Sequence, residues 1–153
     1  MESLDVRVVQ LKAMRVASVQ VIGPSPEMAV WQKLKDWATP KGLLGGGVKV
    51  RLFGFNNPEP EPGKQEYGYE MWLVVGAKIK SDAVVKIKDF NGGRYAVLRV
   101  RGAENIPGAW QQLIVWAGAE HYQQGQHQPL EKLVTLPDVS PNELTLDLHM
   151  PIK

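Results

Sequence analysis

The nine residues Val30 to Ala38, VWQKLKDWA, reappear later in the chain as Ala109 to Ala117, AWQQLIVWA. Trp, Gln, Leu, Trp and Ala match at the same places, and Trp31 and Trp110 are 79 residues apart. Apolar residues recur in both stretches at spacings of three and four, which predicts two amphipathic helices that bury their tryptophans.

The same offset aligns the segments that precede these helices. VASVQVIG, from Val16 to Gly23, corresponds to YAVLRVRG, from Tyr95 to Gly102, with Ala, Val and Gly at matching positions. Two unrelated helices are the simpler alternative, but chance similarity would not extend through a strand and its final glycine. The sequence therefore predicts an internal duplication.

Each copy is expected to form a strand, a helix and two further strands. Ser25 is a suitable N-cap for the first helix, which ends before Pro40, and the Pro-rich loop from Asn56 to Gly63 separates the last two strands. In the second copy, the turn Asn91-Gly92-Gly93 predicts a hairpin. The predicted strands are 14–22, 49–55, 67–75, 84–88, 94–101, 130–136 and 144–150, and the second helix carries Ile106, Trp110, Leu113 and Ala117 on its apolar face.

Short strands with one helix per copy predict an α+β fold, with both helices on one face of an antiparallel sheet and the other face left open. A chain of 153 residues with 44% hydrophobic residues can form one domain, 1–153, with pseudo-repeats at about 5–77 and 83–153.

Composition excludes several kinds of chemistry. The chain has no cysteine, so it has no disulfide, cysteine-zinc site or thiol nucleophile. A net charge of +2 is too small for a strongly basic surface, so direct nucleic-acid binding is not expected. Three histidines show no metal-ligand spacing, and no phosphate loop or dinucleotide fingerprint is present, so no metal or cofactor is expected. No apolar run is long enough for a membrane helix, and the first twenty residues lack a signal-peptide pattern, which favours a cytoplasmic protein.

Two strands carry acidic residues among apolar ones. Glu70 shares a strand face with Trp72, and Glu131 shares one with Leu133. A Glu in an apolar strand suggests the wall of a cavity, although an exposed Glu or one paired with Arg explains it equally well. Tyr95 points away from the expected core face of its strand and could line a groove.

These motifs together resemble the GyrI-like family of effector-binding domains, found in several AraC-type and MerR-type multidrug-responsive regulators and as stand-alone proteins. The resemblance rests on five segments in the right order: Met14–Trp37, Phe53–Val75, Asn91–Gly102, AWQQLIVWA, and QPLEKL at 128–133 before the last strand. It implies a tandem, SHS2-like βαββ fold whose halves frame a central ligand pocket lined by aromatic side chains and closed by a glutamate.

Glu131 matches that glutamate best, and Glu70 matches the family's other recurrent acidic position. Two places depart from the family pattern: Ala103 and Leu133 stand where aromatic residues are common. The residues expected to contact a ligand are Glu131, Glu70, Trp72, Tyr95, Trp110, Leu133, Phe55 and Tyr69.

Three functions remain open. The first is binding of amphipathic, cationic aromatic compounds by a sensor or sequestering protein, because aromatic rings and a desolvated carboxylate suit such ligands. The second is hydrolysis of strained-ring electrophilic toxins, with Glu131 orienting water. The third is inhibition of a protein such as DNA gyrase through surface residues, with a protein partner that the sequence does not identify. The chain begins its repeat within twenty residues and contains no helix-turn-helix, so a stand-alone member is expected.

Overall fold

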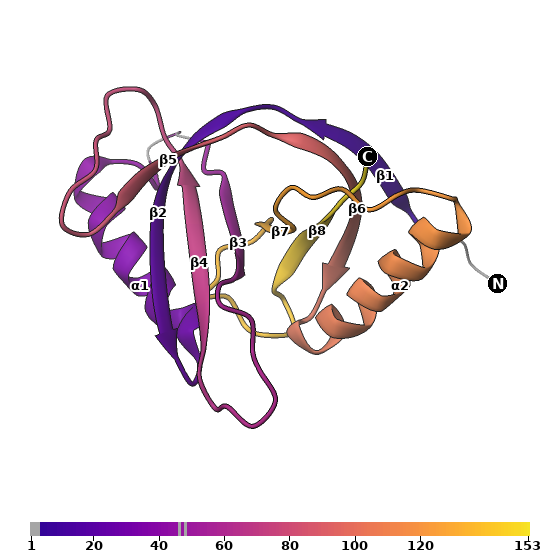
Figure 1. Cartoon of the computed structure of the whole chain (residues 1–153). Coiled ribbons are helices and arrows are strands. Elements are labelled where there is room, and N and C mark those ends of the chain that lie inside the picture. Colours follow the sequence, from indigo (N-terminus) through magenta and orange to yellow (C-terminus); the bar gives the residue numbers. More distant parts are fainter. Residues whose placement is uncertain (1–3, 46, 48) are drawn as a thin grey trace. The chain divides into compact units, whose positions relative to one another are not determined.

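Both sequence repeats form the strand, helix, strand and strand that were expected. The computed structural model describes residues 4–45, 47 and 49–153, and within them it shows an α+β protein of eight antiparallel strands and two α-helices (Figure 1). It consists of two compact units, one of residues 14–90 and the other of residues up to 13 together with 91–153. No helix in the described part is long and apolar enough to cross a membrane.

The unit of residues 14–90 contains a four-stranded sheet and one helix. Its strands lie in the order β3, β4, β2, β5, and each pairs antiparallel with its neighbour. Helix α1 begins at Pro26 directly after Ser25, and Gly42, with φ 69°, ends the short 3-10 turn that follows the helix. The elements are β2 (Met14–Gly23), α1 (Pro26–Ala38), β3 (Leu52–Asn56), β4 (Tyr67–Val74) and β5 (Lys86–Phe90).

The second unit has the same arrangement. Its strands lie in the order β7, β8, β6, β1, so that β6, α2, β7 and β8 repeat the path of β2, α1, β3 and β4. The elements are β1 (Val6–Leu11), β6 (Gly93–Arg101), α2 (Ile106–Ala119), β7 (Leu130–Leu133) and β8 (Thr145–Pro151).

The predicted hairpin at Asn91-Gly92-Gly93 is wrong. β5 pairs with β2, and β6 pairs with β1, so the chain passes from one unit to the other at this turn. Gly92 has φ 80° and lies so close to the backbone of Leu11 and Lys12 that a Cβ atom would overlap it. The glycines therefore allow two backbone segments to pass close to each other. The same Asn-Gly-Gly sequence is also typical of a hairpin turn, which explains the wrong prediction.

Strand β1 was not among the predicted strands, because none of its side chains is fully buried and polar residues interrupt its apolar ones. The strands predicted at 49–55 and 130–136 are shorter than expected, since β3 starts at Leu52 and β7 ends at Leu133. Single hydrogen bonds continue beyond these ends, since Arg51 accepts from Val74 of β4, and Val134 and Thr135 donate to Thr145 of β8.

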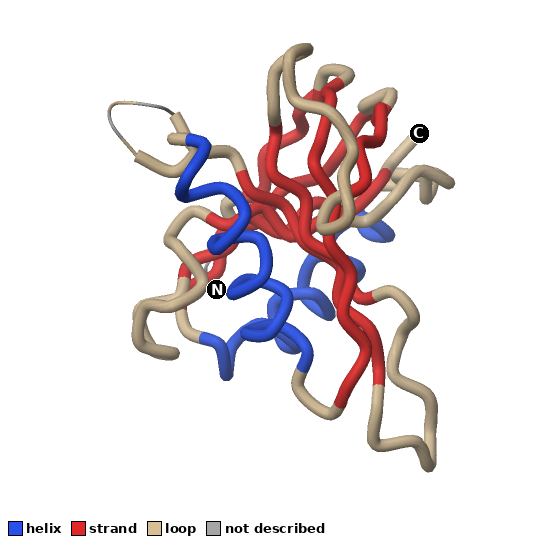
Figure 2. The backbone as a smooth tube through the Cα atoms, turned by 90° about the vertical axis from the view of Figure 1, so that its left-hand side faces the viewer, coloured by secondary structure: helices blue, strands red, loops and turns tan. Residues whose placement is uncertain are grey.

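Each helix covers one face of its own sheet, as the blue helices and red strands of Figure 2 show. In the second unit, Ala109, Leu113 and Ala117 of α2 pack against alternate residues of β6 and β8, namely Ala96, Leu98, Val100, Leu146, Leu148 and Met150. In the first unit, Tyr67 of β4 hydrogen-bonds to Glu27 of α1, which places the odd-numbered residues of β4 on the helix side. Even-numbered residues of β4 therefore lie on the opposite face.

The repeated tryptophans belong largely to the core, as their pattern predicted. Trp31 and Trp37 of α1 are buried, with exposed fractions of 1% and 6%. Their counterparts Trp110 and Trp116 of α2 are only half-buried and pack at the edge of the core. Helix α2 thus leaves more of its aromatic surface accessible than α1 does.

Candidate functional site

The strand registers place a buried carboxylate at the same position in both units. Glu70 lies opposite Gln20 in the first unit, and Asp147 lies opposite Arg99 in the second. Gln20 and Arg99 are related by the 79-residue offset of the sequence repeat. Both acids are nearly inaccessible, with exposed fractions of 2% for Glu70 and 4% for Asp147. The duplication therefore includes an acidic position that sequence comparison of the helices did not reveal.

Glu70 is surrounded by hydrogen-bond donors. Its Oε2 accepts from Ser18 Oγ at 2.8 Å, Trp72 Nε1 at 2.6 Å and Lys88 Nζ at 2.7 Å. Its Oε1 accepts from Asn57 Nδ2 at 3.0 Å. Burial alone would raise the pKa of Glu70, but hydrogen bonds from Lys88, Trp72, Asn57 and Ser18 outweigh it and hold the pKa below its ordinary value. Glu70 is thus an ionised, neutralised carboxylate rather than a proton donor.

Aromatic rings surround Trp72 on the same face. Phe55 meets it edge-on with ring centroids 5.0 Å apart, and Phe90 lies 5.2 Å away on its other side. The predicted proximity of Glu70 and Trp72 is confirmed, and Phe55 joins them. This face lies opposite α1, since all three positions alternate with helix-facing ones.

Asp147 is neutralised differently. Arg99 donates to both of its oxygens, at 2.8 and 3.1 Å, and Arg7 of β1 donates at 3.3 Å. Burial alone would raise the pKa of Asp147, but the hydrogen bond and charge of Arg99, and the charge of Arg7, lower it. His149, at the position equivalent to Trp72, shares this face, and burial lowers its pKa.

Tyr95 lies on the face of β6 opposite α2, as predicted, but it is completely buried. Its ring contacts His127 and His149 edge-on, and its hydroxyl donates to the carbonyl of Gln128 at 2.5 Å. Burial raises its pKa. Tyr95 thus fixes the 120–128 loop to the sheet.

Glu131 lies on the other side of its sheet, next to α2. Trp110 Nε1 donates to Glu131 Oε2 at 3.3 Å, and both side chains are half-buried. Leu133, two residues further along β7, packs with Trp110 against the core. Of the predicted ligand-contacting residues, these three lie together on the α2 side of this unit.

The equivalent place in the first unit has no acid. Register with β8 and β4 makes Gly54 the counterpart of Glu131, and the ring of Tyr69 lies directly over Gly54. Trp31, the counterpart of Trp110, has a buried Nε1 without a hydrogen-bond partner in the described residues. The two units therefore differ at this position: one pairs an indole with a carboxylate, and the other fills the space with an aromatic ring.

Within each unit, the predicted residues lie on both faces of its sheet. Glu70, Trp72 and Phe55 are together on one face of the first unit, and Tyr69 is on its helix side. Asp147 was not among the predicted residues. The 79-residue offset places the counterpart of Glu70 at position 149, two residues beyond Asp147. The cations Lys88 and Arg99 were not predicted either, because no motif marks them. Among the described residues, no group of three or more potential ligands is arranged to hold a metal ion.

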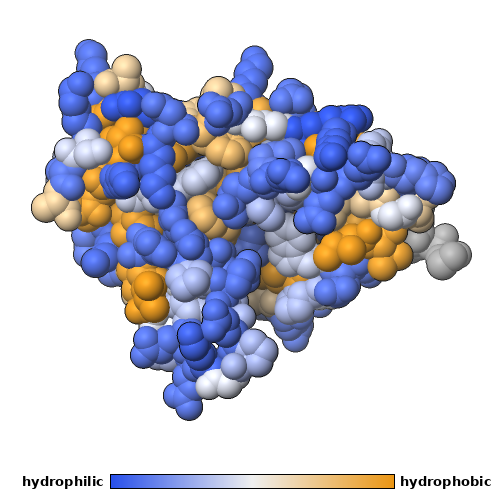
Figure 3. Space-filling view, in the orientation of Figure 1, coloured by the Kyte–Doolittle hydropathy of each residue, from blue (hydrophilic) through white to orange (hydrophobic). Residues whose placement is uncertain are grey.

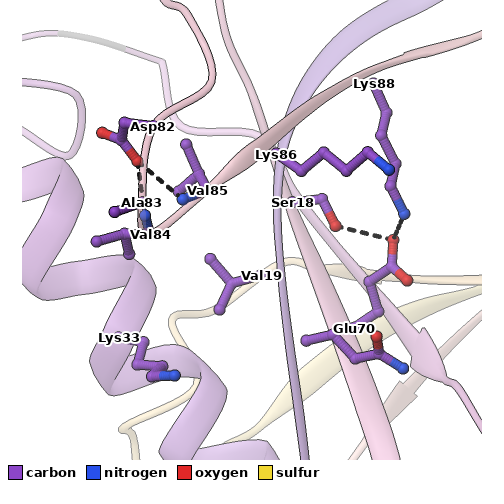
Figure 4. Close-up of a pocket in the computed structure, with 11 residues that line it drawn as sticks. Ser18, Val19, Lys33, Glu70, Asp82, Ala83, Val84, Val85, Lys86 and Lys88 are labelled. Carbon is purple, nitrogen blue, oxygen red and sulfur yellow. Dashed lines mark hydrogen bonds and ion pairs between the residues drawn. The ribbon is translucent and has the colours of Figure 1, made fainter.

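A hollow of about 280 Å³ also lies in the first unit, beside Glu70 and between β2, α1 and the segment that leads into β5 (Figure 4). Its lining is mainly polar and includes Lys33, Lys86 and Lys88. Exposed apolar side chains also lie on α2, where Ile114 and Val115 are 51% and 69% exposed, and apolar atoms are visible over this helix at the right of Figure 3.

The chain is an α+β protein of the type that binds small molecules. It belongs to the GyrI-like small molecule binding domain family, whose sequence model matches residues 4–153. No curated protein matches the sequence.

Solved structures share the fold at low sequence identity. The C-terminal domain of EcmrR is 13% identical, with 97% of each chain covered and a TM-score of 0.71. A hydrolase from Listeria innocua is 12% identical, with 97% of this chain and 91% of that one covered and a TM-score of 0.72. SAV2435 bound to tetraphenylphosphonium is 13% identical, with 98% and 94% covered and a TM-score of 0.59.

Proposed function

We propose that this chain binds small amphipathic, cationic aromatic compounds, as a sensor or a sequestering protein, and that Glu131 and Trp110 contact the ligand. The proposal treats residues 1–153 as one ligand-binding domain. It also includes a cytoplasmic location and no direct contact with nucleic acid, which the net charge of +2 supports.

The observation that carries this proposal is the half-buried pair of an indole and a carboxylate. Trp110 Nε1 donates to Glu131 Oε2 at 3.3 Å, and helix α2, which supplies Trp110, contains no charged residue. An aromatic face next to a partly desolvated carboxylate favours a flat or globular organic cation over a hydrated metal or an anion. Leu133 adds apolar contact beside the pair.

Glu70 is less suited to primary recognition of a cation. Lys88 already neutralises it, so a cationic ligand at Glu70 would have to displace the ammonium group from 2.7 Å. We therefore assign Glu70, Trp72 and Phe55 a supporting role, in which they shape the sheet rather than supply the charge. Tyr69 and Tyr95 are also assigned to the framework, since each is packed against the chain.

The comparisons support a cationic ligand class by analogy. SAV2435 was solved with tetraphenylphosphonium, a lipophilic cation with four aromatic rings. The family itself is one of small-molecule binding. Neither names the ligand of this chain, so the choice of a lipophilic cation depends on the chemistry of the Glu131 pair.

Hydrolysis is the second candidate, and the same pair favours it. A half-buried carboxylate beside an aromatic ring can orient a water molecule, while the aromatic ring stabilises charge that develops on a substrate. A structural neighbour from Listeria innocua is described as a hydrolase. In this chain, Glu131 would be the base and Trp110 the aromatic ring.

A titration with recovery of the ligand distinguishes the two candidates. Tetraphenylphosphonium is titrated against the wild-type chain and Trp110→Leu. In addition, a panel of aromatic cations and epoxides is bound to the protein, and the mass of each recovered compound is measured by mass spectrometry. Saturable binding that is lost in Trp110→Leu, with every compound recovered intact, supports a binding protein. A mass increase equal to one water in a bound epoxide supports hydrolysis, and no binding of any compound would contradict both.

A further inference from the structure

Strand β2 is only half covered along its outer edge. It runs for ten residues from Met14, but β5 pairs with it only from Met14 to Ser18. From Val19 to Gly23, β2 pairs with β4 on one side, and no strand of the described chain pairs with it on the other. An unpaired strand edge presents backbone donors and acceptors that can accept a further strand.

Two residues point their backbone groups toward this open edge. The amide of Val75 donates to the carbonyl of Arg15, so odd-numbered residues of β2 direct their backbone groups toward β4. In an antiparallel sheet the direction alternates, so the N–H and C=O groups of Gln20 and Ile22 point outward. Both residues are exposed, and the exposed fraction of Ile22 is 58%.

The edge is open because the chain before β5 is held elsewhere. Asp82 Oδ1 accepts from the amides of Val84 and Val85, and its Oδ2 accepts from Trp37 Nε1 of α1 at 2.8 Å. These contacts hold the segment against the helix, so it meets β2 only at Lys86. The hollow of about 280 Å³ is the space left between them, and Figure 4 shows Val19 of β2 pointing into it, opposite Val84 and Val85.

The rim of the hollow is positively charged. Lys33 of α1 and Lys86 line it, and both are exposed. The segment from Lys78 to Lys88 contains four lysines and a single acid, Asp82, whose oxygens are already occupied by donors from the chain. A partner that enters here is favoured if it carries negative charge.

We propose that an extended, acidic segment of a partner protein binds along the open edge of β2. The segment runs antiparallel to β2, next to the end of β5 at Lys86, and its backbone pairs with that of Gln20 and Ile22. Acidic side chains of the segment reach Lys33 and Lys86, while apolar ones contact Val84 and Ile22. The residues of this surface do not include Glu131 or Trp110, so the inference does not depend on the proposed small-molecule function.

Peptide selection tests the proposal although the partner protein is unidentified. Random ten-residue peptides displayed on phage are selected on the immobilised full-length chain, and the enriched sequence is synthesised and titrated against ¹⁵N-labelled protein. We expect enriched peptides that are rich in acidic residues, and shifts at the amides of Gln20 and Ile22. We also expect about tenfold weaker binding to Ile22→Pro and to Lys86→Glu, because each removes a backbone donor or a charge partner.

Two controls make the outcome decisive. Lys12→Glu changes charge by the same amount outside this edge and should leave peptide affinity unchanged. A peptide N-methylated at alternate amides should fail to bind the wild-type chain, and this test holds even if Ile22→Pro does not fold. Tetraphenylphosphonium affinity should be the same for Ile22→Pro and wild type.

Several results would overturn the proposal. These are failure to enrich any acidic peptide, equal binding of the N-methylated peptide, and equal competition by random single-stranded DNA, which would indicate charge alone. Self-association of the wild type that Ile22→Pro abolishes would assign the edge to a second copy of the chain instead.

Discussion

Glu70 is a buried carboxylate with one cationic and three neutral donors, all from positions distant in sequence from one another. A buried charge is costly unless such donors compensate it, so the network must form together with the sheet. Lys88 is the member that supplies the opposite charge. It connects the edge strand β5 to β4 across β2.

We therefore expect Lys88→Met to destabilise the protein more than Lys86→Met. Loss of one partner of a buried ion pair costs about 3–5 kcal/mol, and the 37% exposure of the Lys88 side chain reduces this to about 1–3 kcal/mol. Lys86 lies on the same strand, is exposed and has no such bond, so its change should cost less than about 0.5 kcal/mol. Urea unfolding measures both, and equal midpoints would show that Lys88 does not compensate Glu70.

Acid should weaken the protein through the two buried carboxylates. The pKa values of Glu70 and Asp147 are below their ordinary values in the folded chain, so the unfolded chain takes up protons first as pH falls. Their stabilising contribution is complete above about pH 5 and is lost as pH falls through the folded pKa values. We expect Glu70→Gln to show a smaller loss of unfolding free energy between pH 5 and pH 3 than wild type. Parallel pH profiles would contradict this.

At the scale of elements, hydrophobic periodicity and the Gly and Pro residues at segment ends predicted most elements nearly to their ends. These are β2, α1, β4, β6, α2 and β8. Pairing was less predictable. The glycine pair at 92–93 has the composition of a hairpin turn, yet the strands on either side of it pair with different neighbours. Local composition shows that the chain bends, but the partner of a strand depends on contacts far along the chain, such as that of Val6 with Leu98.

Gly68 is an element-scale requirement of β4. A Cβ atom there would overlap the backbone carbonyl of Asn57, which accepts a hydrogen bond from the side chain of Gln20. We expect Gly68→Ala to lower the unfolding free energy by about 3 kcal/mol, because backbone cannot move aside as a flexible side chain would. Gly118 of α2 has open space around it, so Gly118→Ala should raise stability by about 0.5–1 kcal/mol. Thermal unfolding of both variants measures these changes. An unchanged midpoint for Gly68→Ala would contradict the requirement for glycine at this position.

At the scale of the whole molecule, the sequence repeat and the structural units have different boundaries. The repeat suggested copies at about 5–77 and 83–153. In the structure, β1 belongs to the unit of the second copy, and β5 belongs to the unit of the first copy. β1 precedes β2 in sequence but pairs with β6, and β5 precedes β6 but pairs with β2. A pattern that compares segments in order cannot reveal this exchange.

The exchange predicts which fragment folds. Residues 14–90 contain a complete four-stranded sheet with its helix, whereas residues 5–77 include β1 without β6 and lack β5. We expect the 14–90 fragment to show cooperative urea unfolding and a dispersed NMR spectrum, and the 5–77 fragment to show neither. If the 5–77 fragment were the better folded of the two, the division at Ala13 and Phe90 would be incorrect.

The sequence suggested the members of the candidate site better than their grouping. Glu131, Trp110 and Leu133 were selected by motif and lie together, but Tyr95 is enclosed by two histidines from a loop and the last strand. The cations that neutralise Glu70 and Asp147 were also missed, since Arg7 lies 140 residues from Asp147. Charge pairing across a sheet leaves no local pattern in the sequence.

The most direct test of the central claim is calorimetric titration of a charged and a neutral ligand against matched glutamate variants. Tetraphenylphosphonium and uncharged triphenylphosphine oxide are titrated against wild type, Glu131→Gln and Glu143→Gln, in which Glu143 is an exposed acid of the same unit. We predict that Glu131→Gln weakens the cation by about 1.5–3 kcal/mol, or roughly 10- to 150-fold, and leaves the neutral compound unchanged. Equal cation affinity in Glu131→Gln and Glu143→Gln would contradict a ligand site at Glu131.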